Sequence, residues 1–200
     1  MKPFVYLASQ SPRRAQLLEQ LGVAFELLLP EAHEDAEGLE VVMPHELPVQ
    51  YVQRVTELKL DAALKRLKAK KWPLAPVLCC DTTVALRREI LGKPSDDLHA
   101  VRMLQSLSGQ THKVLTAVAV GTVRKRAQVL SQSRVTFTEM SLRQIKAYVA
   151  TGEPMGKAGA YAAQGRAAMY IQSIHGSYTG IIGLPLFETA QLLQTFGCKL

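Results

Sequence analysis

The stretch FVYLASQSPRRAQLLEQL, residues 4–21, decides how the first part of this chain is predicted to fold. Phe4 to Ala8 is a short apolar run, which is typical of a buried β-strand. A polar turn follows, and apolar side chains then recur at helical spacing between Leu17 and Leu21. Pro12 suits the first helical position, because its missing N–H is not needed there. The stretch therefore predicts a strand, a turn and a helix.

Two adjacent arginines, Arg13 and Arg14, lie in the first turn of that helix, after Ser11 as a natural N-cap. Cations are unfavourable at a helix N-terminus, because the macrodipole is positive there. A bound anion would explain them, since backbone N–H groups, the hydroxyls of Ser9 and Ser11 and two guanidinium groups would converge on phosphate oxygens. The alternative is that both arginines are solvated surface residues in an ordinary strand–helix connection.

Length and composition favour a globular protein with one domain, residues 1–200, or two lobes that share a core. Hydrophobic residues make up 48% and charged residues 20%, and the apolar runs are far shorter than the roughly 20 residues of a membrane span. The N-terminus lacks a signal-peptide h-region, and the three cysteines lack metal-ligand spacing. We therefore expect a cytoplasmic protein with reduced cysteines and no membrane partner.

The formal net charge of +7 makes nucleic acid one conceivable partner. The basic residues lie in scattered clusters, however, and aromatic residues, 6% of the chain, do not interleave with them as a stacking platform would require. A small polyphosphate ligand explains the basic balance equally well. We therefore expect a nucleotide-sized substrate and no stable nucleic-acid complex.

Predicted strands and helices alternate along the chain, which indicates an α/β fold. The expected strands cover residues 4–8, 23–29, 77–80, 112–123, 129–137 and 169–174, and the expected helices cover residues 12–21, 44–71 (beginning near residue 48), 95–107, 141–150 and 185–196.

Asp81 is the sharpest single position, because it stands where the apolar strand 77–80 is expected to end. Ligands in open α/β sheets gather at the carboxyl ends of strands. A carboxylate there could bind a divalent metal, or accept a proton from a water that attacks phosphorus. The alternative is that Asp81 caps a turn with Thr82 and Thr83.

Four further positions have both a functional and an ordinary interpretation. Lys93, between Gly92 and Pro94, could reach a phosphate or be a hairpin lysine. Glu34, in an acidic loop, could help to hold Mg²⁺ or be solvated. Lys59, on the long helix, could point into a cleft or into water. Gln164 could read a pyrimidine edge with its amide, or lie free on the surface.

Short motifs that occur in order along almost the whole chain, from Val5 to about Leu193, resemble the Maf family of nucleoside triphosphate pyrophosphatases. The motifs are SQSPRR (9–14), DT (81–82), GKP (92–94), LSGQTH (107–112), YVATGEP (148–154), KAGAY (157–161), QG (164–165), GSY (176–178) and GLP (183–185). Each motif alone is weak, but the ordered set is highly specific.

The resemblance implies hydrolysis of a nucleoside triphosphate between its α and β phosphorus atoms, with release of a monophosphate and pyrophosphate. It implies a divalent metal, Mg²⁺ or Mn²⁺, and a homodimer. The implied fold is a mixed twisted sheet with flanking helices, in two lobes around a central cleft, similar to inosine triphosphate pyrophosphatases. The alternatives are a non-catalytic nucleotide-binding regulatory protein that uses the same cleft, and a basic nucleic-acid-binding module.

Roles for individual residues also follow from the resemblance alone. The family's catalytic carboxylate corresponds to Asp81, which is also placed on the metal, and an acidic metal-site residue corresponds to Glu34. Specificity positions correspond to Arg13, Thr82 and Gln164, which resemble the branch acting on dTTP and UTP rather than on 7-methyl-GTP. The phosphate-binding positions correspond to Ser9, Arg13 and Arg14, with Lys59 and Lys93 as further cations.

The chain departs from the family pattern in two places. The family usually has Arg-Glu-Lys at the helical lysine, whereas this chain has Glu57-Leu58-Lys59, which moves the acidic residue by one position and about 100° around the helix. The segment Arg166-Ala167-Ala168 replaces smaller, Gly-rich sequence. A metal contact that depends on either segment is expected to be weaker here.

Overall fold

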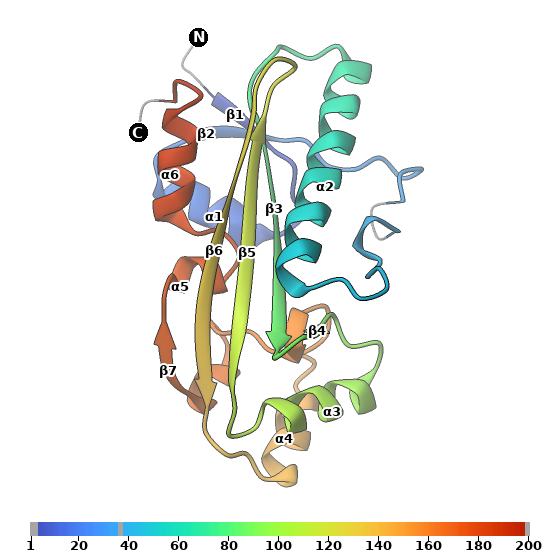
Figure 1. Cartoon of the computed structure of the whole chain (residues 1–200), viewed down its shortest axis with the longest axis vertical. Helices are drawn as coiled ribbons and strands as arrows, with labels where there is room; N and C mark the ends of the chain where they lie inside the picture. Colours follow the sequence, from blue (N-terminus) through green and yellow to red (C-terminus); the bar gives the residue numbers. More distant parts are fainter. Residues whose placement is uncertain (1–3, 36–37, 199–200) are drawn as a thin grey trace.

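The computed structural model describes residues 4–35 and 38–198, which form one mixed seven-stranded sheet with flanking helices (Figure 1). The strand order is β2-β1-β3-β5-β6-β7, and β4 pairs with β3 outside this path. β1 runs parallel to β2 and β3, and the other pairs are antiparallel. The predicted mixed α/β fold is therefore confirmed. The strands are β1 (Phe4–Leu7), β2 (Ala24–Leu27), β3 (Val77–Leu86), β4 (Glu89–Leu91), β5 (Thr111–Gly121), β6 (Arg126–Phe137) and β7 (Ile171–His175).

The helices follow the expected order, with one short addition before the last one. No helix in the described ranges is long and apolar enough to cross a bilayer. The helix α5 was not expected, because its sequence YTGI contains a glycine and a β-branched threonine and carries no helical periodicity. The helices are α1 (Pro12–Gln20), α2 (Pro48–Lys70), α3 (Asp97–Leu107), α4 (Leu142–Val149), α5 (Tyr178–Ile181) and α6 (Leu186–Gln194), and the 3₁₀ turns are η1 (Gly38–Glu40), η2 (Ala158–Ala160) and η3 (Arg166–Tyr170).

The central sheet buries both of its faces, and alternate residues of β3 divide between them. Val77 and Cys79 pack in a cluster with Leu60 and Leu67 of α2. Leu78 and Cys80 pack in a second cluster, with side chains of α1 and α6. Because side chains alternate along a strand, Asp81 must face α2, whereas Thr82 must face the α1 and α6 side.

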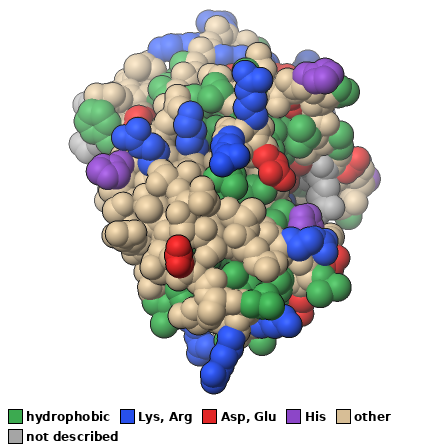
Figure 2. Space-filling model, turned by 60° about the horizontal axis from the view of Figure 1, so that its bottom comes forward, with side chains coloured by type: hydrophobic (Ala, Val, Ile, Leu, Met, Phe, Trp, Pro, Cys, Tyr) green, Lys and Arg blue, Asp and Glu red, His purple; other side chains and the backbone are tan. Residues whose placement is uncertain are grey.

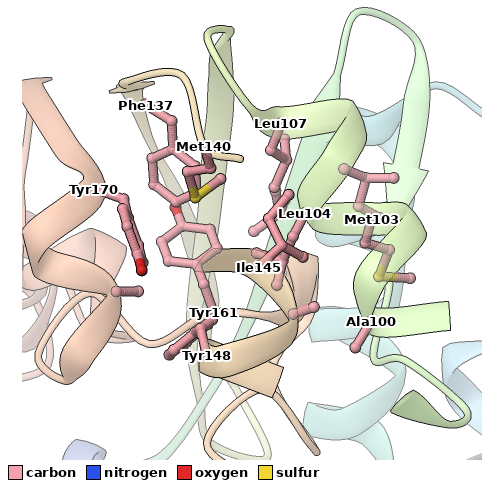
Figure 3. Close-up of a cluster of buried hydrophobic side chains, with 14 of the residues drawn as sticks. Ala100, Met103, Leu104, Leu107, Phe137, Met140, Ile145, Tyr148, Tyr161 and Tyr170 are labelled. Atoms are coloured by element: carbon pink, nitrogen blue, oxygen red, sulfur yellow. The ribbon is translucent and has the colours of Figure 1, made fainter. Parts of the chain in front are cut away.

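A third cluster fills the other end of the long strands, where α3 and α4 pack beneath β4 (Figures 1 and 3). Leu104 and Leu107 of α3 lie against Ile145 of α4, and the rings of Phe137 and Tyr161 approach edge to face with centroids 4.9 Å apart. This cluster anchors the segment around η2, so that the long strands connect a core near α2 with a core near α3.

β3 is longer than the sequence predicted, and this changes the position of Asp81. The strand continues through Asp81 to Leu86, because β5 pairs with every residue from Val77 to Ala85. The prediction that Asp81 follows the end of an apolar strand is therefore wrong, and so is the alternative that it caps a turn. The strand that does end near this point is β1, whose last paired residue is Leu7, opposite Leu78.

Among the described strands, the edge of β3 that does not pair with β5 is covered only at its two ends. β1 pairs with it at Val77 and Leu78, and β4 pairs with it from Val84 to Leu86. Among the described residues, no strand pairs with this edge between Cys79 and Thr83. We call this five-residue stretch the β3 gap. The turn after β1 and the start of α1 lie beside it, because the backbone N–H of Ala8 donates to the carbonyl of Leu78 at 2.9 Å.

Candidate active site

The charged side of the β3 gap is built from four segments, which are η1, α2, β3 itself and the turn after β4. Lys59 of α2 donates to Asp81 Oδ1 at 2.5 Å and to Glu40 Oε1 at 2.8 Å. Lys93, after β4, donates to the other oxygen of Glu40 at 2.9 Å. The structure therefore brings the predicted residues Lys59, Asp81 and Lys93 together through Glu40. We call these four side chains the charged cluster.

Partial burial and neighbouring charges shift the pKa values of Lys59 and Glu40 in this cluster. Burial alone would lower the pKa of Lys59, but the carboxylates of Asp81 and Glu40 outweigh it, and the pKa is raised. Burial likewise opposes ionisation of Glu40, but Lys59 and Lys93 hold the pKa of that carboxyl below its usual value. Both side chains are therefore charged at neutral pH, so the cluster presents ammonium and carboxylate groups in alternation.

Sequence reasoning missed Glu40 and the residue that holds it, Tyr51. The Tyr51 hydroxyl donates to the backbone carbonyl of Glu40 at 2.9 Å. Burial, followed by the negative charges of Asp81 and Glu40, raises the pKa of Tyr51 to about 12, so it remains a donor. Two sequence features pointed in this direction, namely the acidic loop before the long helix and the missing acidic neighbour of Lys59. They could not show that Glu40 is the loop residue that contacts Lys59, because the loop contains several acidic residues.

Glu34, predicted on the metal, is instead paired away from the cluster. Its two oxygens accept from Arg66 Nε at 2.7 Å and Arg66 Nη2 at 2.6 Å, while Arg66 Nη1 donates to the carbonyl of Leu28. The hydrogen bonds from Arg66 lower the pKa of Glu34 to about 2. This bidentate pair joins the loop after β2 to α2, which is a structural use of the carboxylate.

Glu57, the displaced acidic residue of the long helix, makes no ion pair among the described residues. Lys59, two positions later, takes its carboxylate partners from Glu40 and Asp81 instead. Among the described residues, Glu57 therefore gives Lys59 no carboxylate, which agrees with its displacement by one position around the helix.

The opposite side of the β3 gap is held together by Arg14. Arg14 Nη1 donates to Ser9 Oγ at 3.1 Å, and Arg14 Nη2 lies 3.5 Å from Thr82 Oγ1. Arg14 Nε donates to the carbonyl of Gly183 at 3.0 Å. A residue with a side chain would be strained at Gly183, whose φ is +121°. The structure therefore joins the predicted residues Ser9, Arg14 and Thr82, and adds the loop after α5.

Ser11 occupies the N-cap position of α1, but its hydroxyl makes no capping hydrogen bond. Ser9 Oγ instead accepts from the backbone N–H of Ser11 at 3.2 Å. The prediction of Ser11 as the N-cap residue is therefore confirmed for its position, although its hydroxyl satisfies no helix N–H. Pro12 has no N–H and the N–H of Arg14 donates to the Ser11 carbonyl at 3.1 Å, so among the described residues the backbone N–H of Arg13 is the first-turn donor that is left for an anion.

Arg13 is half-buried and makes no hydrogen bond or ion pair within the described ranges. Burial, followed by repulsion from Arg14, lowers the pKa of its guanidinium. Like charges that face each other without a partner are destabilising, and a bound anion would relieve them. Arg14 has only uncharged partners, so neither guanidinium at this helix start is neutralised by a carboxylate among the described residues, and Arg13 also lacks a hydrogen-bond partner there.

Gln164 is exposed, and its side chain makes no hydrogen bond with the described residues. Its segment is nevertheless fixed on both sides. Glu153 accepts from the hydroxyl of Tyr148 at 2.7 Å and from the backbone N–H of Arg166 at 3.0 Å. Tyr161 Oη lies 2.9 Å from His112 Nε2. The structure therefore holds the backbone that carries Gln164 without placing its amide against a partner.

A divalent metal was expected at Asp81. No group of three or more His, Cys, Asp and Glu side chains in residues 4–35 and 38–198 is arranged to hold a metal alone. Asp81 and Glu40 nevertheless offer carboxylate oxygens to the same ammonium group, Lys59 Nζ. Mg²⁺ usually takes one or two protein carboxylates and completes its shell with water and substrate phosphates. The donor set therefore fits a metal that is shared with a bound polyphosphate.

The molecular surface gives little support to a nucleic-acid interface. On the face shown in Figure 2, several Lys and Arg side chains gather in the upper half beside an acidic side chain, and others lie apart near the lower edge. At the β3 gap itself, Lys59 and Lys93 are already paired with carboxylates. This arrangement suits a compact anion better than an extended strand.

Comparison with known proteins identifies the class. The profile of the Maf-like protein family matches residues 4–196, and the chain belongs to that family. A 68% identical relative in Albidiferax ferrireducens, aligned over 100% of both chains, is named dTTP/UTP pyrophosphatase. The same name is given to a 64% identical relative in Polaromonas sp., over 98% of each chain, and to a 56% identical relative in Burkholderia pseudomallei, over 96% of this chain and 93% of that one.

Among solved structures, a nucleoside-triphosphatase described as a dITP/XTP pyrophosphatase, from Mycobacterium abscessus, aligns with 70% of this chain and 76% of its own. Its TM-score of 0.41 and identity of 16% are too low to add to the family assignment.

Proposed function

We propose that this protein is a nucleoside triphosphate pyrophosphatase that hydrolyses dTTP and UTP. Water would add to phosphorus, the α–β phosphoanhydride bond would break, and the monophosphate and pyrophosphate would leave. The observation that carries this proposal is the β3 gap, where the charged cluster around Asp81 lies next to the helix start that carries Arg13 and Arg14. The shared name of relatives 56–68% identical over nearly the whole chain supports the same activity and substrates.

The phosphate chain would bind at the start of α1. Arg13 supplies a guanidinium without a partner among the described residues and its own backbone N–H, and Ser9 supplies a buried hydroxyl. Arg14 is already oriented by Gly183 and Ser9, so it loses little freedom when it contacts a phosphate. Lys93, about half exposed, can turn from Glu40 toward the leaving pyrophosphate.

The reacting water would be served by Asp81. Asp81 is 7% exposed, and Lys59 and Thr83 hold its carboxylate on the α2 face of the strand. From there it can orient the water and accept its proton, while Lys59 stabilises negative charge that develops on the phosphoryl oxygens. These fixed charges need no reorganisation at the moment of reaction.

Asp81 and Glu40 are the residues that would hold a divalent cation, Mg²⁺ or Mn²⁺. When bound, the metal would neutralise phosphate oxygens and lower the pKa of a coordinated water. Glu40 replaces Glu34 in this assignment, because Glu34 is engaged by Arg66 whereas Glu40 shares Lys59 with Asp81. We choose Glu40 because its carboxylate contacts the same ammonium group, Lys59 Nζ, as the carboxylate of Asp81.

Base selection would fall to Thr82 and Gln164, with Arg13 between the base and the phosphates. The exposed amide of Gln164 offers both a donor and an acceptor, which suits the edge of uracil or thymine.

Homodimer formation and a cytoplasmic location also belong to this proposal and rest on family resemblance. Size-exclusion chromatography with light scattering would test the dimer.

The proposal is tested by incubating the purified protein with a panel of canonical and modified nucleoside triphosphates. Pyrophosphate and orthophosphate are measured separately, with Mg²⁺, with Mn²⁺ and with excess chelator. We expect pyrophosphate from dTTP and UTP, no orthophosphate, and loss of turnover with chelator. Tight dTTP binding without turnover would indicate the regulatory alternative, and steeply salt-dependent DNA binding without hydrolysis would indicate the nucleic-acid alternative.

A further inference from the structure

Thr116 lies directly opposite Thr82 on the neighbouring strand β5. Its side chain is 1% exposed, and the two Oγ1 atoms are 2.9 Å apart. Thr116 Oγ1 also lies 2.7 Å from the carbonyl oxygen of Gly180 in α5. The three groups form a chain of hydrogen bonds that begins at the β3 gap and ends inside the protein.

The direction of this chain follows from the number of protons. A carbonyl oxygen can only accept, so the single hydroxyl proton of Thr116 is committed to Gly180. The contact between the two threonines then requires the proton of Thr82, which must point toward Thr116. Each threonine has one proton to give, and both protons are directed inward.

Arg14 also makes the Thr82 hydroxyl oxygen an acceptor. A guanidinium has no acceptor atom, so Arg14 Nη2, at 3.5 Å, can only donate toward Thr82 Oγ1. Thr82 therefore has no proton left for a ligand, although it remains partly exposed at the gap. What it presents outward is a lone pair of its oxygen.

We propose that Thr116 is a positioning residue that fixes the Thr82 hydroxyl as an acceptor, so that the site selects a nucleobase with an N–H at this point. Uracil and thymine carry a proton on N3, whereas N3 of cytosine is itself an acceptor and would meet the Thr82 lone pair. The inference rests on the proposed function and explains how that site distinguishes UTP from CTP. An unmatched polar pair in a water-excluded site weakens binding by about tenfold or more.

A ribose hydroxyl is the other group of a nucleotide that could donate to Thr82. The two sources predict different preferences. A base donor makes Thr82 discriminate between UTP and CTP, which share the same sugar. A ribose donor makes it discriminate between UTP and dUTP, which share the same base.

The test measures kcat/KM for UTP, CTP and dUTP in the wild type, in Thr116→Val and in Thr116→Ser. Valine is nearly the same size but cannot accept from Thr82, whose proton is then free to serve N3 of cytosine. We expect the CTP/UTP ratio of kcat/KM to rise about tenfold or more in Thr116→Val, and to keep its wild-type value in Thr116→Ser. The UTP/dUTP ratio is expected to stay constant in all three proteins.

A purely structural role for Thr116 would lower kcat/KM equally for all three nucleotides and leave the ratios unchanged, which would overturn the inference. A wild type that already accepts CTP as well as UTP would overturn it too, as would a shift confined to the UTP/dUTP ratio. None of these results would remove the pyrophosphatase assignment, which fails only if the wild type releases no pyrophosphate from UTP or dTTP.

A second pair of variants covers the case in which Thr116→Val does not fold, as judged by circular dichroism and thermal melting. Thr82→Val removes the acceptor itself, at a partly exposed position, and Thr82→Ser retains it. We expect the CTP/UTP ratio to rise in Thr82→Val only. An unchanged ratio in a folded Thr82→Val would also contradict the inference.

Discussion

Asp81 and Thr82 are neighbours on one strand, yet they serve two regions of opposite character. The α2 face at Asp81 carries two ammonium and two carboxylate groups in direct contact. The opposite face at Thr82 carries hydroxyls, backbone carbonyls and one guanidinium. The two side chains are separated because successive side chains of a β-strand point to opposite faces of the sheet.

This difference assigns different tasks to the two faces. Strong fixed charges stabilise a transition state in which phosphate charge redistributes, but they attract any polyphosphate, whatever its base. Oriented hydroxyls add little attraction for phosphate, but they reject a base whose donors and acceptors do not match. We therefore expect changes of the charged cluster on the Asp81 face to alter the rate for all substrates, and changes of the hydroxyls of Thr82 and Thr116 to alter the choice among them.

The largest expected effect separates the two faces with one substitution on each. Asp81→Asn keeps the shape of the side chain but removes its charge and its ability to accept a proton. We expect kcat to fall by about 10²-fold or more for every nucleotide, with an unchanged circular dichroism spectrum. Thr82→Val, the matched change on the other face, is expected to alter nucleotide preference far more than the maximal rate. Full turnover of Asp81→Asn would refute the assignment of roles.

The next effect decides which glutamate belongs to the charged face. Glu40→Gln removes one partner of Lys59 and a proposed metal ligand, so we expect at least a tenfold loss of kcat/KM and a higher Mg²⁺ requirement. Glu34→Gln leaves the cluster intact and weakens the Arg66 pair, so its effect is expected on stability. A metal titration of activity measures the first effect and thermal melting measures the second. The reverse pattern would return the metal site to Glu34.

The Glu34 pair also has a defined pH dependence. The pKa of Glu34 is about 2 in the folded protein, below its ordinary value of 4.5, so the pair stabilises the fold fully above pH 4.5. This contribution decreases as the pH falls from 4.5 toward 2. The melting temperatures of wild type and Glu34→Gln should therefore converge through that range.

The sequence predicted most of the fold but located Asp81 for the wrong reason. The apolar run before Asp81 suggested a strand end, whereas Val84 and Ala85 continue the strand against β5. What ends beside Asp81 is β1, and strand pairing between distant segments is not visible in local periodicity. The helix start at Arg13 was predictable because it depends on adjacent residues.

Contacts across long sequence separations were the part that sequence could not supply. Glu34 and Glu40 lie in the same acidic loop, and only the path of the chain decides which of them reaches Lys59. The role of Thr116 depends on register, because a shift of β5 by one residue would turn its side chain to the α2 face. Residue type alone does not contain that information.

A smaller expected effect concerns His112, whose side chain must be uncharged in the folded protein if the Thr82 side of β5 carries no charge. His112 lies on the same side of β5 as Thr116, four residues earlier, and burial lowers its pKa to about 4. Because the unfolded chain protonates this histidine near pH 6.5, stability should decrease as the pH falls from 6.5 to 4, by up to about 3 kcal/mol. Chemical denaturation of wild type and His112→Gln across this range measures the contribution, which the variant should lack. Parallel pH profiles would contradict it.

The smallest expected effect concerns an ion pair outside both faces. Arg126 Nη1 lies 2.5 Å from Asp61 Oδ1, but both side chains are more than 40% exposed. Water and salt screen such a pair, so Asp61→Asn should change the unfolding free energy by less than about 1 kcal/mol and leave kcat/KM unaltered. The variant removes a carboxylate from α2, the helix that carries Lys59, and is therefore the matched control for Glu40→Gln. If it lowered activity comparably, charge around α2 in general, rather than the contacts of Asp81 and Glu40, would explain the chemistry of that face.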